Sequence, residues 1–206
     1  MSPVIQRYIL ERTKSFDAIS EERINTLKII SSFVQKKIDQ GQIAELLYIC
    51  KNNSKRSHFG QIWSKVAATY YGFTNVQTYS GGTEVTAFNP NAIKAIEAIG
   101  FKVKTIYNSP NPTYRIDFGD FDMVIQCFSK KYDDPENPKK GFCVVTTYAE
   151  GDHICPHIEG TDIRISTPYN DFKTFDGTPR QHEMYLEGSK QMATECLYVF
   201  SQIRMN

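Results

Sequence analysis

Three reactive side chains lie close together in the sequence at Cys50, Arg56 and Ser57. The apolar run 43–49 predicts a buried strand that ends at the cysteine, and the amphipathic stretch 59–71 predicts a helix. The residues between them would form a loop from the end of a strand to the start of a helix. Backbone N–H groups in such a loop, with the positive end of the helix dipole, bind tetrahedral oxyanions. The sequence therefore places a thiol and a guanidinium beside an expected anion site.

The loop 50–57, called the anion loop below, is expected to bind phosphate along its whole length. Asn53 can adopt a left-handed backbone conformation or bridge the loop with its side chain. Ser57 can donate a hydrogen bond to the sulfur, and Arg56 can bind two phosphate oxygens at once, which a lysine could not do. Lys51 and Lys55 would add positive charge, or would simply be solvated. The expected phosphate-binding residues are Lys51, Asn52, Asn53, Ser54, Lys55, Arg56 and Ser57.

The pattern Cys-x-x-Asn-x-x-Arg-Ser, present here as Cys50, Asn53, Arg56 and Ser57, resembles the phosphate-binding loop of the low-molecular-weight protein tyrosine phosphatases and the related arsenate reductases. The predicted strand 76–80 leads into Gly81-Gly82-Thr83, which resembles a Gly-Thr segment of the same family. The resemblance extends over about residues 43–203. The alternative is a buried structural cysteine near an unrelated surface arginine.

The resemblance implies phosphate-monoester hydrolysis, most specifically of protein tyrosine phosphate, through a cysteinyl-phosphate intermediate on Cys50. It also implies a general acid shortly before the last helix, where Asp171 matches the family's acid although Phe172 replaces the usual proline. Asp134 and Asp176 are rivals for that role. Two aromatic residues beside the acid, Tyr169 and Phe172, would line a substrate pocket or would pack the loop onto the domain.

Arsenate reduction is the alternative activity, because arsenate has the shape of phosphate and would bind in the same loop. The thioredoxin-linked reductases of this family use two further cysteines seven residues apart. Cys155 matches the second of these and is a candidate for a redox relay, but the first position is occupied by Tyr148. A reductase that uses an external thiol, or a non-catalytic phosphate-binding or phosphopeptide-binding module, also remains open.

Strands that alternate with helices predict a three-layer α/β/α domain with a mainly parallel central sheet, similar to the low-molecular-weight phosphatases. We expect a helical extension over 1–42 and a phosphatase-like domain over 43–206. Within the extension, Ser20 would cap an amphipathic helix over 20–40. The region 108–141 is expected to be an inserted β-hairpin.

Composition excludes several other classes of protein. Among the 206 residues the net charge is +1 with interspersed signs, so nucleic-acid binding is not expected. No apolar run is long enough to span a membrane. Five widely spaced cysteines and no signal-peptide pattern suggest free thiols in the cytoplasm. No cofactor or metal site is expected. The expected ligand is a phosphate or arsenate oxyanion, and a phosphotyrosine side chain of another protein is one possible source of the phosphate.

Overall fold

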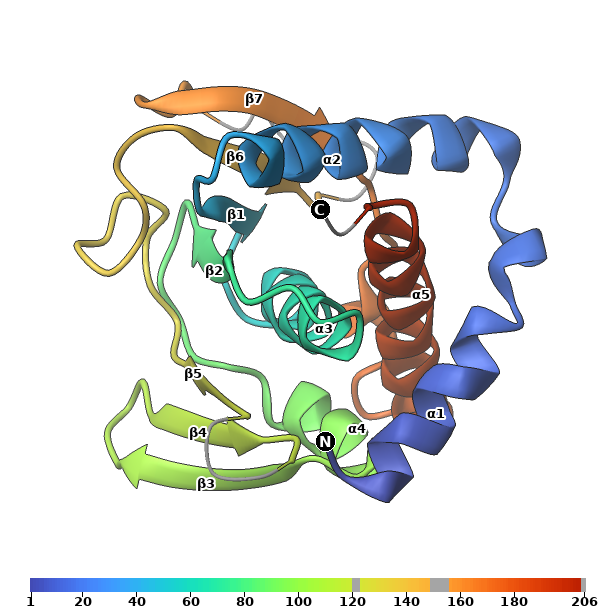
Figure 1. The fold of residues 1–206 in the computed structure, drawn as a ribbon. Helices are drawn as coiled ribbons and strands as arrows, with labels where there is room; N and C mark the ends of the chain where they lie inside the picture. The colour runs from blue at the N-terminus through green and yellow to red at the C-terminus, as the bar shows by residue number, and fades with distance from the viewer. Residues whose placement is uncertain (120–122, 149–155, 205–206) are drawn as a thin grey trace.

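The computed structural model describes residues 1–119, 123–148 and 156–204 (Figure 1). None of the described helices is long and apolar enough to cross a membrane. The helices are α1 (Pro3–Thr13), α2 (Glu21–Asp39), α3 (Arg56–Tyr70), α4 (Pro90–Ile99) and α5 (Gln181–Ser201), with 3₁₀ turns η1 (Phe16–Ala18) and η2 (Phe172–Phe175). The strands are β1 (Ala44–Cys50), β2 (Val76–Gly82), β3 (Lys102–Tyr107), β4 (Thr113–Asp117), β5 (Val124–Cys127), β6 (Phe142–Thr146) and β7 (Thr161–Ser166).

Two helices precede the first strand. The Ser20 hydroxyl caps α2 by accepting a hydrogen bond from the Arg23 N–H, which confirms the helix predicted over 20–40. The sequence analysis did not predict α1, which begins after the cap Ser2 with a proline in its first turn. Both helices bury apolar side chains, such as Ile5 and Leu27, in the same core as the sheet.

The central sheet has the strand order β2-β1-β6-β7, and all its neighbouring strands are parallel. Cys50 lies beside Gly82 at the end of β2, and Ile49 lies beside Thr146 at the end of β6. The carboxyl ends of three strands therefore meet where the anion loop begins. This edge is where parallel α/β sheets bind their ligands.

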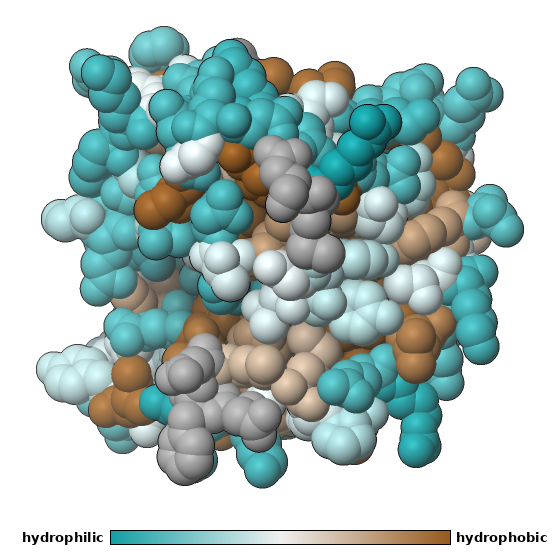
Figure 2. Space-filling model, viewed as in Figure 1, coloured by the Kyte–Doolittle hydropathy of each residue, from teal (hydrophilic) through white to brown (hydrophobic). Residues whose placement is uncertain are grey.

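The predicted three-layer α/β/α class with a parallel central sheet is confirmed. One sheet face carries the main core, to which α2, α3 and α5 contribute (Figure 1). The opposite face buries a smaller cluster that includes Leu47, Val144 and Ile158. The described residues of this cluster lie in strands and loops, so that layer is thin. In Figure 2, hydrophilic side chains gather along the top and the edges of this face, and less polar side chains lie across its centre.

The predicted inserted hairpin is present as part of a separate antiparallel sheet in the order β3-β4-β5. It begins earlier than predicted, since β3 starts at Lys102. A bridge between Gly82 and Lys131 joins the segment after β5 to the end of β2. The inserted sheet therefore leads directly to the edge of the central sheet that carries the anion loop.

Candidate active site

The Cys50 sulfur lies at the end of β1 and is buried, with 3% of the residue exposed. Its Sγ atom is 3.0 Å from Ser57 Oγ. The Asn53 amide donates a hydrogen bond to the same Oγ at 2.9 Å. Since Ser57 accepts from Asn53, its own hydroxyl proton is available for the sulfur. This direction of donation stabilises a thiolate, which is the nucleophilic form of cysteine.

The backbone of the anion loop turns carbonyl groups outward, where they accept hydrogen bonds from residues 83–89. Because the C=O and N–H of one peptide group point in opposite directions, the N–H groups that follow these carbonyls face the inside of the loop. Within the described part of the chain, no backbone N–H of residues 51–55 donates a hydrogen bond. The outward contacts run from Glu84 N–H to Lys51 O (2.8 Å), from Thr86 Oγ1 to Asn52 O (3.1 Å) and from Asn89 N–H to Ser54 O (2.9 Å).

Asn53 has the left-handed backbone that the sequence suggested, with φ of 42°. Its side chain is fully buried, and its Oδ1 accepts a hydrogen bond from the Lys130 N–H at 2.8 Å. Gly82 lies directly against this part of the loop. A Cβ on Gly82 would be 2.6 Å from the Asn53 nitrogen and 2.7 Å from the Lys51 oxygen. The close approach of two backbones thus explains why β2 ends in glycine.

The helix α3 begins at Arg56, so its N-terminus faces the anion loop. Arg56 is 4% exposed, and its Nη1 donates to the Tyr169 carbonyl at 3.1 Å. Its Nη2 lies 3.7 Å from Asp171 Oδ2. The predicted acid and the predicted phosphate-binding arginine are therefore neighbours, although 115 positions separate them in the chain (171 − 56 = 115).

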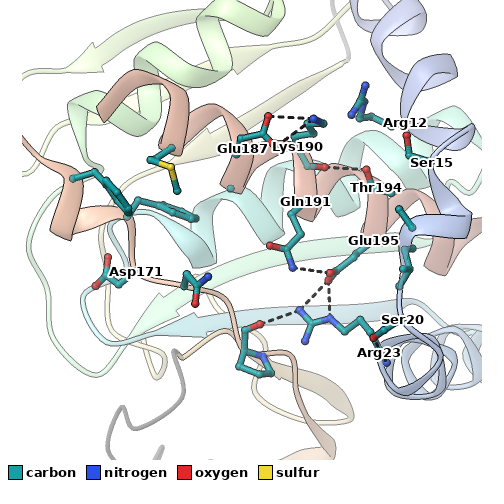
Figure 3. Close-up of a pocket in the computed structure, with 18 of the residues that line it drawn as sticks. Arg12, Ser15, Ser20, Arg23, Asp171, Glu187, Lys190, Gln191, Thr194 and Glu195 are labelled. Atoms are coloured by element: carbon teal, nitrogen blue, oxygen red, sulfur yellow. Dashed lines mark hydrogen bonds and ion pairs between the residues drawn. The ribbon is translucent and has the colours of Figure 1, made fainter. Parts of the chain in front are cut away.

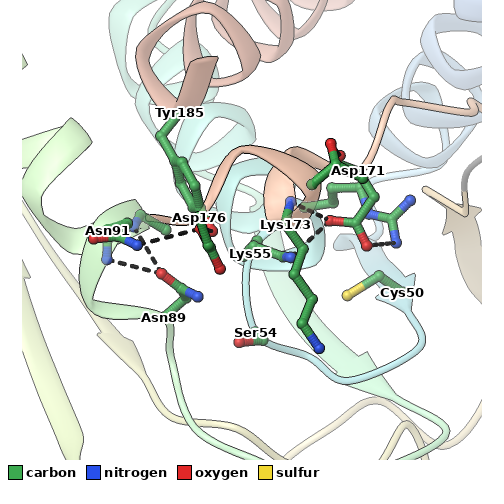
Figure 4. A network of polar contacts seen from close by, with 12 residues as sticks. Cys50, Ser54, Lys55, Asn89, Asn91, Asp171, Lys173, Asp176 and Tyr185 are labelled. Atoms are coloured by element: carbon green, nitrogen blue, oxygen red, sulfur yellow. Dashed lines mark hydrogen bonds and ion pairs between the residues drawn. The ribbon is translucent and has the colours of Figure 1, made fainter. Parts of the chain in front are cut away.

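Asp171 also pairs with Lys55, whose Nζ is 2.6 Å from Oδ1 (Figure 4). Burial alone would raise the pKa of this carboxyl. The hydrogen bonds from Lys55 and the Lys173 N–H, together with the charges of Lys55 and Arg56, outweigh burial and lower the pKa below its usual value of 3.8. Figure 4 shows the carboxylate on the same side of the loop as the Cys50 sulfur. Lys55 is 8% exposed, so it is a buried ion-pair partner rather than a solvated residue.

The other expected phosphate-binding residues differ in their contacts. Lys51 is exposed and lies 3.7 Å from Glu84, to which Asn52 also donates at 3.0 Å. The Ser54 hydroxyl donates to the Ala87 carbonyl at 2.7 Å. These side chains fix the loop to the segment after β2. These residues would therefore bind an anion through their backbone N–H groups and not through their side chains.

Tyr169 and Phe172 do not face the anion loop. The Tyr169 hydroxyl donates to Glu195, and the Phe172 ring packs against Gly188 and Tyr185 of α5. Both residues are at most 6% exposed. This placement does not support the predicted substrate pocket and agrees with the packing alternative. Tertiary packing against α5 decides the direction of these rings, which the sequence around Asp171 does not reveal.

The rivals of Asp171 have local roles. Asp134 accepts from the Glu136 N–H at 3.0 Å and so closes a turn in the 130–141 loop. Asp176 accepts from the Tyr185 hydroxyl at 2.8 Å and flanks η2. Neither is paired with a residue of the anion loop, among the contacts of the described chain.

The predicted relay cysteine, Cys155, lies outside the described residues. Of the other cysteines, Cys143 is buried and lies beside Leu46, four residues before Cys50, which is about 13 Å along the strand. Burial raises the pKa of Cys127 and Cys196 to about 12, and it raises the pKa of Cys143 as well. These three buried thiols therefore resemble core residues more than redox partners.

His58, in the first turn of α3, is fully buried. Its ring packs 4.2 Å from the ring of Phe88, and its Nδ1 is 3.2 Å from Ser80 Oγ. Burial, assisted by the charge of Lys130, lowers the pKa of His58 from 6.5 to about 3. The sequence does not indicate which side of this turn is buried, because the start of α3 has no clear polar face. In the structure the helix is covered on nearly all sides.

No known protein-family model matches the chain, and no curated protein sequence is significantly similar to it. Solved structures share its fold. An arsenate reductase in the phosphate-binding state superposes with a TM-score of 0.52 at 16% identity, covering 79% of this chain and 100% of that chain. A low-molecular-weight phosphotyrosine phosphatase, VcLMWPTP-2 from Vibrio cholerae O395, gives 0.50 at 12% identity over 77% of this chain and 95% of that chain.

These similarities establish the fold. The chain has the architecture shared by low-molecular-weight phosphotyrosine phosphatases and arsenate reductases, as the sequence resemblance predicted. Because both kinds of enzyme have this fold, the fold alone assigns no activity.

Proposed function

We propose that this protein is a cysteine-dependent phosphatase that hydrolyses phosphate monoesters through a covalent cysteinyl phosphate. The observation that carries the proposal is the anion loop itself. The N–H groups that follow the outward carbonyls of Lys51, Asn52 and Ser54 face the inside of a loop at the end of a strand that carries a buried thiol. Such preorganised donors stabilise a phosphoryl group as its charge redistributes in the transition state.

In the first step, the Cys50 thiolate would attack phosphorus while the bond to the ester oxygen breaks. The guanidinium of Arg56 would bind two phosphate oxygens, and the loop N–H groups would hold the others. The Ser57 hydroxyl, 3.0 Å from the sulfur, would stabilise the thiolate until it reacts. The products of this step are a cysteinyl phosphate and the leaving alkoxide or phenoxide.

Asp171 would donate a proton to that leaving oxygen. In the structure its carboxyl is held ionised by Lys55 and Arg56, which lower its pKa. A phosphate dianion bound to Arg56 would add negative charge beside the carboxyl, and a nearby like charge raises the pKa of a carboxylic acid. Substrate binding would thereby favour the protonated acid that the step requires.

In the second step, Asp171 as a carboxylate would take a proton from water while the water oxygen attacks phosphorus. The sulfur–phosphorus bond breaks, inorganic phosphate leaves, and the Cys50 thiolate is restored. No oxidant, reductant or further reactant enters this cycle. Among phosphate monoesters, we propose protein phosphotyrosine as the first physiological class to test.

The test is hydrolysis of p-nitrophenyl phosphate by the purified protein and by Cys50→Ser. We expect turnover by the wild type and none by the variant, with the same melting temperature and retained phosphate binding. Asp171→Asn should lower kcat/KM for phenyl phosphate by about 100-fold or more, and that for p-nitrophenyl phosphate far less, because kcat/KM reports the first step, in which only the poorer leaving group depends on protonation.

Two results would contradict the proposal. Hydrolysis by Cys50→Ser equal to that of the wild type would show that the thiol is not the nucleophile. Absence of hydrolysis by the wild type, with arsenate consumed in the presence of an added dithiol, would instead establish the reductase alternative. That alternative would need an external thiol or Cys155, since the buried cysteines of the described chain offer no relay.

A further inference from the structure

Arg23, at the start of α2, reaches across to the segment that leads to Asp171. Its Nη2 donates to the Pro168 carbonyl at 3.1 Å, and its guanidinium carbon lies 4.6 Å from the centre of the Tyr169 ring. Its Nε donates to Glu195 of α5 at 3.0 Å. The Tyr169 hydroxyl donates to the same carboxylate oxygen. One arginine thus binds two consecutive residues of this segment, called the acid segment below (residues 168–171).

The acid segment also contacts the anion loop. The Tyr169 carbonyl accepts from Arg56 Nη1 at 3.1 Å, and Asp171 pairs with Lys55 at 2.6 Å. A shift of the backbone at Tyr169 would therefore move both the acceptor of the phosphate-binding guanidinium and the carboxylate. Arg23 contacts this segment at Pro168 and at the ring of Tyr169, whose carbonyl accepts from Arg56.

The packing around the acid segment is uneven. After Asp171, the Phe172 ring is buried against α5 and anchors the chain. A cavity of about 990 Å³ lies between the segment, η1 and α5, and residues on both sides of Asp171 line it (Figure 3). Arg23 and Glu195 are among its polar lining residues. Tyr169 is buried in the main core, where Arg23 contacts the face of its ring and Glu195 accepts from its hydroxyl.

We propose that Arg23 is a positioning residue, through which the N-terminal helices hold the acid segment and so set the location of Asp171. The inference rests on the proposed phosphatase function. Arg23 touches neither the anion loop nor a bound anion directly. Its effect is expected in the steps that need Asp171, and not in the folding of α2, which Ser20 caps on its own.

The experiment compares Arg23→Met with the matched control Lys37→Met. Lys37 also lies on α2 and makes an ion pair with the sheet, 2.9 Å from Asp162, but has no contact with the acid segment. Arg23→Lys tests rescue by a conserved charge. Removal of Arg23 leaves Glu195 buried without its partner, which is costly. The double variant Arg23→Met with Glu195→Gln avoids that charge and keeps an acceptor for the Tyr169 hydroxyl.

The readout is kcat/KM for phenyl phosphate and for p-nitrophenyl phosphate, which reports the first step, with the affinity for inorganic phosphate. Misplacement of a catalytic group by about 1 Å costs about 100-fold. We expect both Arg23→Met variants to lose about 10- to 100-fold with phenyl phosphate, but less than about fivefold with p-nitrophenyl phosphate. Arg23→Lys should recover part of the loss, and Lys37→Met should stay within about twofold of the wild type.

Equal losses with both substrates in the folded double variant, or no loss at all, would overturn the inference while leaving the phosphatase proposal in place. Absence of Cys50-dependent hydrolysis by the wild type would overturn the proposed function, and the positioning role with it. The two failures are therefore distinguished by the wild-type measurement alone.

Discussion

Asn53 combines a left-handed backbone with two buried hydrogen bonds. Its replacement should therefore lower the free energy of unfolding, and the contributions of the backbone and of the hydrogen bonds can be measured separately. Its alanine variant would leave the Lys130 N–H without the acceptor that it has at 2.8 Å. An unsatisfied buried donor costs about 1–3 kcal/mol. Alanine at φ of 42° adds about 1 kcal/mol, because it lacks the short polar side chain through which asparagine tolerates the left-handed region. We expect Asn53→Ala to lower the free energy of unfolding by about 2–4 kcal/mol.

Two further variants at this position separate the contributions. Asn53→Gly loses the same hydrogen bonds, but glycine adopts the left-handed conformation without strain. It should therefore be about 1 kcal/mol more stable than the alanine variant. Asn53→Asp keeps an oxygen for the Lys130 N–H but places a negative charge in the anion loop. Two unit charges about 5 Å apart repel by about 3 kcal/mol at an effective dielectric constant of about 20. Phosphate affinity should therefore fall at least about tenfold.

Urea unfolding followed by the fluorescence of Trp63, the single and fully buried tryptophan, measures the stability. Titration calorimetry with inorganic phosphate measures the affinity. A stability of Asn53→Ala within about 0.5 kcal/mol of the wild type would refute the assigned role of the Lys130 hydrogen bond. Equal stabilities of the alanine and glycine variants would refute the contribution of the backbone conformation. Unchanged phosphate binding by Asn53→Asp would refute the placement of the anion.

Three other predictions follow from the same geometry. Ser57→Ala removes a hydrogen bond to the thiolate worth about 1.5–3 kcal/mol, so kcat/KM for p-nitrophenyl phosphate should fall about 10- to 100-fold, and an unchanged value would contradict the donation to Cys50. Gly82→Ala forces a Cβ within 2.6 Å of the Asn53 backbone and should cost about 1–3 kcal/mol, seen as a lower Tm, whereas an unchanged Tm would show that the loop can move aside. The folded-state pKa of His58 is lowered from 6.5 to about 3, so stability is fully present above pH 6.5 and is lost as the pH falls towards 3. Between pH 6.5 and 5 the loss should approach about 2 kcal/mol in urea unfolding and should disappear in His58→Phe.

Local patterns in the sequence predicted the elements around the anion loop. A run of apolar residues up to Cys50 and an amphipathic stretch after it predicted the order of strand, loop and helix, which the structure confirms. Ser20 predicted the start of a helix because a cap acts within three residues of itself. The pairing of Asp171 with the loop followed from the family resemblance and agrees with the contact to Lys55.

The remaining features depend on contacts between distant parts of the chain. The acceptor role of Asn53 depends on Lys130, which lies 77 residues further on. The burial of Tyr169 and Phe172 depends on α5, and the Arg23 contacts depend on how α2 lies across the sheet. No periodicity or spacing encodes these meetings. An isolated arginine near a helix start gives no sign that it will reach a loop 145 residues away.

The inserted sheet sets a limit on how far this protein could be shortened. The four residues after β5 are held to the anion loop and to β2: Ser129 Oγ donates to the Asn52 carbonyl at 3.0 Å, and the Gly82 N–H donates to the Lys130 carbonyl at 2.9 Å. A smaller engineered version without the three strands between α4 and this segment would lose buried core residues such as Ile116 and Ile125. It would also need to keep residues 128–131 in place, because their hydrogen bonds hold the outside of the anion loop. The inserted segment and the anion loop therefore depend on each other. A graft of the loop into another scaffold would have to include residues 128–131.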